Sequence, residues 1–296
     1  MIIQILIFLK RIIAIFSNTP NKIFETVQIE TTSFCNAKCS FCPNKTLKRS
    51  KNFMSNKVFD LILNKLKKEK IQVNIFALHL NGEPLLDKKI FKRITKIKRK
   101  FKQSKVRFTT NFYLANKEII QKLLASKLDE ITISVNTTNP EDYTKIMGLA
   151  DYNRTLNNIS LLIKEKNKSN SNLKVNLSIV ETAINTNEVV NFKNIWKDKA
   201  NIRVIKLGQW VNENIPKNYK ENNAVQQVCS NLNNSISFLS NGDFALCCFD
   251  AEGLIRKNIQ TDNILTTYNS IAFQRIRDYQ KTNGLTNPEC KNCSFK

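Results

Sequence analysis

The chain has little glycine, proline or histidine: of 296 residues, 6 are Gly, 6 are Pro and 1 is His. These low counts exclude collagen-like, glycine-linker and proline-rich proteins. Cysteine is absent between Cys42 and Cys229, so the 8 cysteines fall into two groups. Such grouping favours metal ligation over a disulfide framework and predicts a reducing, cytoplasmic setting. Hydrophobic residues at 42% and charged residues at 24% predict an ordinary globular core.

Acidic residues are also scarce, with 24 Asp and Glu against 47 Lys and Arg, which leaves a formal charge of +23. A charge of this size is typical of proteins that bind polyanions. Here most of the cations are lysines, and Asn and Ile are abundant too, which is the composition of an AT-rich genome. No region interleaves arginine with aromatic residues as a nucleic-acid groove does. We therefore favour a solvated lysine surface, and nucleic acid is disfavoured as a partner.

Residues 1–20 form an apolar segment that Lys10 and Arg11 interrupt, so it is shorter than a membrane-spanning helix. It also lacks the charge order and cleavage site of a signal peptide. Wound as a helix, it places Gln4 and Arg11 on one face, with apolar side chains over most of the rest. The favoured interpretations are packing within the protein and peripheral contact of residues 1–18 with a membrane or partner, and a spanning or secreted role is a third, disfavoured one.

From residue 21 the chain alternates short β-branched runs with longer amphipathic stretches, which predicts βα units, a parallel sheet and an α/β fold. An Asn-rich stretch near 212–223 reads as a linker, so the expected domains are 21–212 and 213–296. In the second domain, strands at 235–239 and 244–248 flank Gly242 in a predicted hairpin, and a helix is expected at 266–280. The predicted strands of the first domain are 26–31, 74–80, 106–110, 130–135, 174–180 and 202–207, and its helices are 56–70, 87–101, 117–126, 140–147, 152–166 and 187–197.

Three cysteines follow the first predicted strand within eight residues: Cys35, Cys39 and Cys42. Thiolates at such spacings bind iron-sulfur clusters or zinc. Three ligands on a four-iron cluster leave one iron open to a substrate or cofactor. At these residues the chain resembles the radical S-adenosylmethionine (SAM) superfamily, whose cysteines are spaced by three and two residues with an aromatic residue before the last. Phe41 fills the aromatic place.

This resemblance implies a [4Fe-4S] cluster that binds SAM at its open iron. It also implies reductive cleavage of SAM to methionine and a 5'-deoxyadenosyl radical, which abstracts hydrogen from substrate. Low-potential donors such as flavodoxin or ferredoxin are the implied source of electrons. The implied fold is a partial (β/α)6 TIM-type barrel.

Further matches follow in the family's order, each at the end of a predicted strand. Leu80–Leu86 is similar to the GGEP motif, with Asn81 in place of its first glycine, and it makes Gly82 and Glu83 candidate SAM contacts. Thr109–Asn111 resembles the TNG element, with Phe112 in place of glycine. Ile133–Asn136 is similar to a segment that contacts SAM. The remaining contacts that the resemblance implies are Asn111, Ser134 and Asn136.

The single histidine, His79, precedes residues 82–84, here called the GEP turn, and is either packed in the core or in contact with substrate or SAM. Residues on or after the sixth strand are candidates for the substrate side of the barrel, although a structural or solvent-facing role is open for each. No catalytic base is identified. The candidates after strand six are Arg203, Lys206, Gln209 and Trp210.

The later cysteines resemble the opening of the SPASM domain and its shorter twitch form. The resemblance implies one auxiliary [4Fe-4S] cluster in a small metal-organised α+β domain, and a structural zinc in the same thiolates stays open. Because alternate residues of a strand face opposite ways, only one of Cys247 and Cys248 is expected to reach the metal, and the spacing from Gly242 selects Cys247. The implied ligands are Cys229, Cys247, Cys290 and Cys293.

The expected activity is that of a radical SAM enzyme acting on a small-molecule or peptide substrate. Twitch-type relatives include an aminocyclitol dehydrogenase, so one hypothesis is two-electron oxidation of a sugar or cyclitol alcohol. A second is modification of a peptide or protein, and a third is another radical rearrangement or epimerisation. The competing class of protein is a basic, non-catalytic binding module stabilised by metal. A protein of this class would not explain the motifs at the strand ends.

Overall fold

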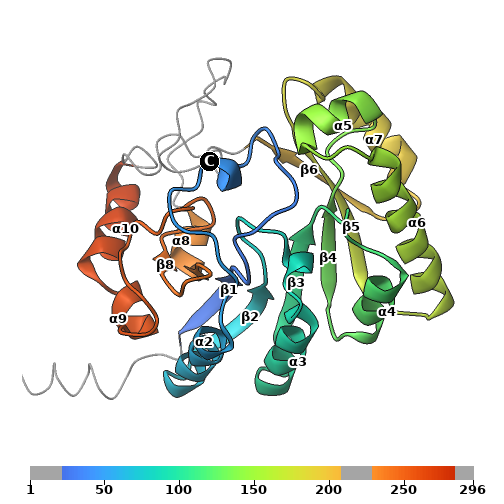
Figure 1. The fold of residues 1–296 in the computed structure, drawn as a ribbon. Helices are drawn as coiled ribbons and strands as arrows, with labels where there is room; N and C mark the ends of the chain where they lie inside the picture. Colours follow the sequence, from blue (N-terminus) through green and yellow to red (C-terminus); the bar gives the residue numbers. More distant parts are fainter. Residues whose placement is uncertain (1–21, 208–228, 284–296) are drawn as a thin grey trace, which may run out of the picture.

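A computed structural model describes residues 22–207 and 229–283. Its strands form one sheet in the order β6-β5-β4-β3-β2-β1-β7-β8 (Figure 1). The first six strands pair in parallel with their neighbours in the sequence, as consecutive βα units require. All six lie where the sequence predicts strands. They are β1 (Ile23–Ile29), β2 (Gln72–Ala77), β3 (Lys105–Thr110), β4 (Glu130–Ser134), β5 (Lys174–Glu181) and β6 (Asn201–Lys206).

Helices connect these strands and cover one face of the sheet (Figure 1). The predicted positions are confirmed to within a few residues at each end. The α-helices of this part are α2 (Asn56–Lys68), α3 (Ile90–Lys100), α4 (Lys117–Ala125), α5 (Pro140–Met147), α6 (Tyr152–Lys168) and α7 (Val189–Trp196), and the 3-10 helices are η1 (Pro43–Thr46), η2 (Pro84–Leu86) and η3 (Thr186–Glu188).

The core lies between these helices and the sheet. On β3, Val106 and Phe108 are fully buried while Arg107 between them is half-buried, which is the alternation of a strand with one covered face. The facing helices bury stripes at helical spacing, such as Ile62 and Leu66 of α2. Each side chain of this size stabilises the fold by about 1.5–3 kcal/mol on burial.

The C-terminal segment joins the same sheet. Strand β7 (Ser235–Phe238) pairs in parallel with β1, and β8 (Phe244–Ala245) pairs antiparallel with β7. The predicted hairpin is confirmed, with Gly242 at a φ of +93° in its turn. Its second strand is shorter than predicted and ends before the cysteines. The C-terminal helices are α8 (Ser230–Asn234), α9 (Ile264–Tyr268) and α10 (Ile271–Asn283).

Two predictions about this segment are wrong in detail. The single helix expected at 266–280 is two helices, because α9 ends at Tyr268 and a new helix starts at Ile271. Cys247 and Cys248 lie in a bend and a turn rather than in a strand, so strand alternation does not choose between them. The division near residue 212 stays a prediction, and residues 1–20 lie outside the described residues. No described helix is long and apolar enough to cross a membrane.

Candidate active site

The predicted motifs of the barrel gather at the edge of the sheet where β1 to β4 end, the upper edge in Figure 1. This is the edge where α/β barrels place ligands, because consecutive parallel strands end side by side. The cysteine loop, defined here as residues 30–42, follows β1. Glu83 follows β2, Asn111 follows β3, and Ser134 is the last residue of β4.

The three front cysteines lie half-buried on this loop. Burial, together with the charges of Glu83 and Cys42, raises the pKa of the Cys35 thiol to about 12. Burial also raises the pKa of Cys39, and both Cys42 and Cys35 add to that shift. The thiols are therefore close enough to disfavour one another's ionisation. A bound metal reverses this balance, because metal ligation deprotonates the thiols.

The three thiols of the cysteine loop are a suitable set of ligands for a [4Fe-4S] cluster. Within residues 22–207 and 229–283, no three His, Cys, Asp or Glu side chains surround one point as ligands of a single ion do. Ligands of a [4Fe-4S] cluster each bind a different iron, and thiolates are the side chains that hold such clusters. The side chains present therefore fit the cluster that the sequence predicts.

The GEP turn lies directly against the cysteine loop. A Cβ atom added at Gly82 would come 2.0 Å from the carbonyl oxygen of Thr32. The Glu83 amide donates a hydrogen bond of 2.9 Å to the carbonyl of Phe34. Only glycine allows this approach of the two backbones, which explains Gly82 at this position.

Glu83 is the buried anion of the site, with 2% of its surface exposed. Its carboxylate accepts hydrogen bonds from the Thr110 hydroxyl at 2.6 Å, the Asn111 amide at 2.8 Å and the Leu85 amide at 3.0 Å. Burial raises the pKa of Glu83, while these three bonds oppose the shift. The bonds orient the carboxylate, and a cationic ligand would relieve the cost of its burial.

The side chain of Asn111 is directed toward the cysteine loop. Its Nδ2 donates to Asn36 Oδ1 at 3.0 Å and lies 4.0 Å from Cys35 Sγ. Its Oδ1 accepts from the Tyr113 amide. Phe112, in the glycine place of the TNG element, has a φ of +59° and is fully buried, so the core stabilises a backbone shape that glycine adopts more readily.

The other predicted contacts lie nearby. Ser134 shares a 3.4 Å hydrogen bond with Ser178 of β5. Asn136 is 1% exposed and has a φ of +66°. Its Oδ1 accepts from the Val180 amide, and its Nδ2 donates to the sulfur of Met147. Phe41 packs against the core.

A polar wall lines the sheet face that the helices leave uncovered. Glu130 of β4 accepts from Arg203 of β6 at 2.8 Å and lies 4.0 Å from Arg107 of β3. Burial, with the charge of Arg107, lowers the pKa of His79 to about 3, so this histidine is neutral at pH 7. Among the described residues, His79 Nδ1 and Asn176 Oδ1 are buried without a hydrogen-bond partner. Of the other candidates, Lys206 is exposed at the end of β6, and Gln209 and Trp210 lie outside the described residues.

The C-terminal cysteines are only partly described. Cys229 precedes α8, and its amide donates to Gln280 of α10. Cys247 Sγ accepts from the Phe249 amide, and Cys248 Sγ lies 4.0 Å from Asn231 Nδ2. Cys290 and Cys293 lie outside the described residues, so the predicted four-thiolate set stays a prediction.

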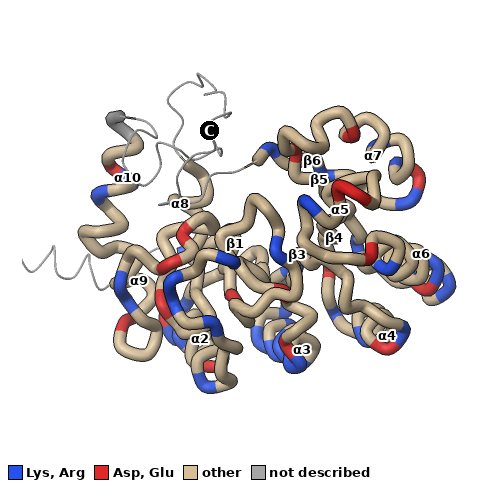
Figure 2. Tube along the Cα trace, turned by 45° about the horizontal axis from the view of Figure 1, so that its top comes forward, with Lys and Arg blue, Asp and Glu red and all other residues tan. Residues whose placement is uncertain are grey.

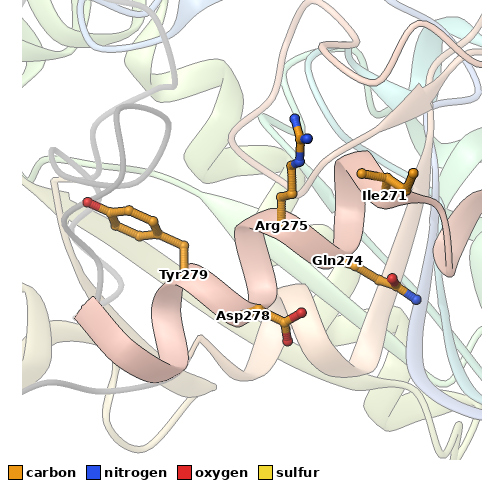
Figure 3. A pocket seen from close by; sticks show the side chains of 5 residues that line it. All are labelled: Ile271, Gln274, Arg275, Asp278 and Tyr279. Atoms are coloured by element: carbon orange, nitrogen blue, oxygen red, sulfur yellow. The ribbon is translucent and has the colours of Figure 1, made fainter.

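A hollow of about 500 Å³ lies beside α10 (Figure 3). Its described lining comes from this one helix and contains no residue of the strand-end motifs. It is therefore not the candidate active site. The lining residues are Ile271, Gln274, Arg275, Asp278 and Tyr279.

Sequence reasoning missed the contacts that support the cysteine loop. Glu30, Arg49 and Met147 carry no motif, and their partners lie far away in the chain. One sequence feature pointed to these contacts: Asn81 replaces the first glycine of the GGEP motif. Its amide and its Nδ2 both donate to Glu30 Oε1, so the substituted side chain has a structural partner.

Comparison with known families and proteins agrees with this arrangement. The family model of the radical SAM superfamily matches residues 29–188, and the model of an iron-sulfur cluster-binding domain, SPASM, matches residues 229–294. An uncharacterized protein of Methanocaldococcus jannaschii is 29% identical over 195 residues, which are 64% of this chain and 60% of that protein. A GTP 3',8-cyclase of Limosilactobacillus fermentum is 27% identical over 63% of this chain and 55% of its own length. The chain thus spans about half to three-fifths of these curated relatives.

Solved structures share the fold over most of the chain. BtrN in complex with AdoMet and 2-DOIA superposes with a TM-score of 0.63 at 18% identity, covering 93% of this chain and 94% of BtrN. Streptococcus suis SuiB bound to the precursor peptide SuiA gives a TM-score of 0.60 at 18% identity, covering 92% of this chain and 70% of SuiB.

Proposed function

The chain belongs to the radical SAM superfamily and carries a SPASM-type iron-sulfur domain, and we propose that it cleaves SAM at the edge of the sheet where Glu83 meets the cysteine loop. The proposed ligands of the SAM-binding [4Fe-4S] cluster are Cys35, Cys39 and Cys42. The observation that carries the proposal is the buried Glu83 carboxylate, which is near enough to the Cys35 and Cys39 thiols for its charge to act on both. When bound, cluster and SAM supply a 5'-deoxyadenosyl radical that removes a hydrogen atom from substrate.

The residues of the chain supply binding and orientation. Glu83 offers a fixed, buried anion to the ammonium group of SAM, a pairing that offsets the cost of burying either charge alone. Gly82 keeps the GEP turn against the cysteine loop, so the anion lies beside the cluster ligands. Ser134 ends β4, two strands away from β2, and offers a hydroxyl to the same ligand.

For the substrate we infer a small hydroxyl-bearing molecule, such as a sugar or cyclitol. The supporting feature is the polar wall of Arg107, Glu130 and Arg203, because guanidinium groups donate and a carboxylate accepts hydrogen bonds, and hydroxyl groups can do both. His79 Nδ1 and Asn176 Oδ1 add two buried polar atoms without partners among the described residues. Such atoms favour a polar ligand, because each costs free energy while unpaired.

The proposed reaction is oxidation of a secondary alcohol to a ketone. The carbinol carbon loses a hydrogen atom, the hydroxyl loses a proton, and one electron remains to be removed. The proposed auxiliary ligands Cys229, Cys247, Cys290 and Cys293 would hold the cluster that accepts this electron. The fold resembles that of BtrN over 94% of the BtrN chain, and BtrN was solved with the small molecule 2-DOIA, which supports a small-molecule substrate.

Peptide modification is the second candidate, and one observation favours it. In the described sheet, β6 is an edge strand, with Val204 37% and Ile205 40% exposed. An extended peptide can add to such an edge through backbone hydrogen bonds.

We further propose an acidic, low-potential electron donor such as flavodoxin or ferredoxin. The last turns of α2, α3 and α6 carry basic residues, as Figure 2 shows in blue. Lysines there also stabilise the helix dipoles, and the exposed side chains of Lys68 and Arg99 can attract an anionic partner. A donor bound in this way would dissociate as salt concentration rises.

Peripheral membrane contact through residues 1–18 is a separate proposal, for a protein that otherwise acts in the cytoplasm. The apolar sequence of this segment precedes Lys22, which leads into β1 at the edge of the sheet where α2 and α3 end. Flotation with anionic liposomes, with and without residues 1–18, tests it. Equal flotation of both proteins would remove the proposal.

SAM cleavage is tested by anaerobic reconstitution followed by incubation with SAM and dithionite. We expect 5'-deoxyadenosine from the wild-type enzyme and none from the C35A/C39A/C42A variant. E83Q should keep its iron but bind SAM at least tenfold more weakly, because the anion is lost. Cleavage that survives the triple substitution would refute the proposed site.

The substrate class is tested with molecules that carry deuterium on one carbinol carbon. Transfer of deuterium into 5'-deoxyadenosine, with a ketone product, would identify an alcohol substrate. A parallel panel holds GTP and unstructured peptides. Transfer from a peptide alone would replace the alcohol proposal with the peptide one.

A further inference from the structure

The end of α5 is attached to the cysteine loop on both sides of Cys39. The Lys38 amide donates to the carbonyl of Met147 at 3.0 Å, and the Ser40 amide donates to that of Ile146 at 2.8 Å. The loop thus satisfies two carbonyls at the helix end that have no partner within the helix.

Gly148 makes this approach possible. It ends α5 in the left-handed conformation, with a φ of +62°. A Cβ atom placed on it would come 2.8 Å from the Cβ of Lys38 and 3.0 Å from the Lys38 carbonyl oxygen. Any larger residue would push the helix end away from the loop.

The side chain of Met147 fills the space behind Cys39. Its sulfur lies 3.7 Å from Cys39 Sγ, and the residue is only 1% exposed. Tyr143, one turn earlier on α5, is fully buried and close enough for the charge of Cys39 to raise its pKa. Apolar and aromatic groups therefore exclude water from this side of the Cys39 sulfur.

Asn136 holds the thioether in place. Its Oδ1 accepts from the Val180 amide at 2.9 Å, which orients the amide so that Nδ2 faces Met147 Sδ at 2.9 Å. Its carbonyl accepts from Asn185 Nδ2 at 2.6 Å. The polar atoms of Asn136 are thus committed to β5, to Asn185 and to Met147.

We propose that Met147 is a positioning residue that shields the Cys39 thiolate from water and so keeps the reduction potential of the SAM-binding cluster low. Cluster potentials depend on hydrogen bonds to the sulfurs and on solvent exposure. Water or N–H groups near a ligand sulfur stabilise the more negative reduced state and raise the potential. The thioether has no N–H or O–H to donate. This inference rests on the proposed function for the identity of the cluster.

The test is a redox titration of the reconstituted, full-length enzyme followed by electron paramagnetic resonance. Three variants are compared with the wild type: M147Q, M147L and M54Q. Met54 is the matched control, because it is also 1% exposed, and its amide bonds to the carbonyl of Thr31 rather than to a residue beside Cys39. The SAM-binding cluster is recognised as the one whose signal changes when SAM is added.

We expect M147Q to raise the ratio of reduced to oxidised cluster at least tenfold at a fixed potential, a shift of about 59 mV for one electron. M147L should stay within threefold of the wild type, because it excludes water equally well, and so should M54Q. If M147Q does not fold, M147A carries the same expectation, because it admits water to the cavity.

Two results would overturn the inference: a potential in M147Q equal to that of M54Q, or a shift in M147L as large as in M147Q. Failure of the proposed function looks different, because no cluster signal would then respond to SAM in the wild type. Loss of iron on exposure to air gives a second readout, which we expect to be faster in M147Q than in M54Q.

Discussion

The carboxylate of Glu30 lies 2.7 Å from the guanidinium of Arg49, with both side chains buried at 0% and 9% exposure. The same carboxylate accepts from the amide of Asn81, directly before the GEP turn, and from the amide of Ser240 in the C-terminal hairpin. Arg49 also donates to the carbonyl of Ala251. One buried ion pair therefore joins the end of β1, the GEP turn and the C-terminal segment.

Removing the charge of Glu30 should destabilise the protein strongly. In E30Q, Arg49 stays buried without a counter-charge, and we expect a loss of about 3 kcal/mol in the free energy of unfolding. Anaerobic urea titration measures it. The control is E118Q, which breaks an exposed pair with Lys122 and should leave the free energy of unfolding nearly unchanged. Equal losses in the two variants would contradict the role of the Glu30 pair.

Gly82→Ala should displace the cysteine loop. The added Cβ would overlap the backbone of Thr32 and Phe34, which cannot move as a flexible side chain does. We expect loss of the SAM-binding cluster, measured as iron and sulfide content, with the auxiliary iron retained. The control is G253A, at a φ of +79° but with its nearest neighbour at 3.1 Å. It should cost about 1 kcal/mol of stability and keep both clusters.

His79 should make stability depend on pH. Its pKa falls from 6.5 to about 3 in the folded protein, because burial and Arg107 disfavour the charged form. Below pH 6.5 the unfolded chain binds a proton that the folded chain does not. Stability should therefore fall as pH drops from 6.5 toward 3, by up to about 1.4 kcal/mol per pH unit. The free energies of unfolding of wild type and H79N, measured with urea at several pH values, isolate the contribution of His79. The same pH dependence in both proteins would contradict the prediction.

Asp250 should be needed for the auxiliary cluster. Its carboxylate accepts from the amides of Leu246, Gly253 and Leu254, and so shapes the loop that holds Cys247. Burial raises the pKa of Asp250, and these bonds oppose the rise. In D250N the amide NH2 would face backbone donors and open the loop.

The background C35A/C39A/C42A isolates the auxiliary iron for this test. We expect about four irons per chain in this background, and fewer than one after D250N is added. The surface substitution D262N should leave the count unchanged. Retention of four irons with D250N would show that the loop does not need the carboxylate.

The sequence alone determined the positions of the strands and helices. It also determined most of the candidate functional residues at the sheet edge that forms the candidate active site. Strand and helix positions follow from short-range periodicity, so the six strands from β1 to β6 were predictable. Cys35, Cys39 and Cys42 were predictable as a group because their spacing is local. Glu83 was predictable because its motif ends a strand, and consecutive parallel strands end at one edge.

Tertiary structure decided which groups meet across long stretches of chain. The pairing of β7 with β1, the bond from Ser240 to Glu30 and the contact of Met147 with Cys39 join residues 108 to 210 positions apart. Neither partner carries a local pattern that names the other. Their meeting depends on how the sheet curves and how helices pack on it, which is settled only when buried groups find partners in three dimensions.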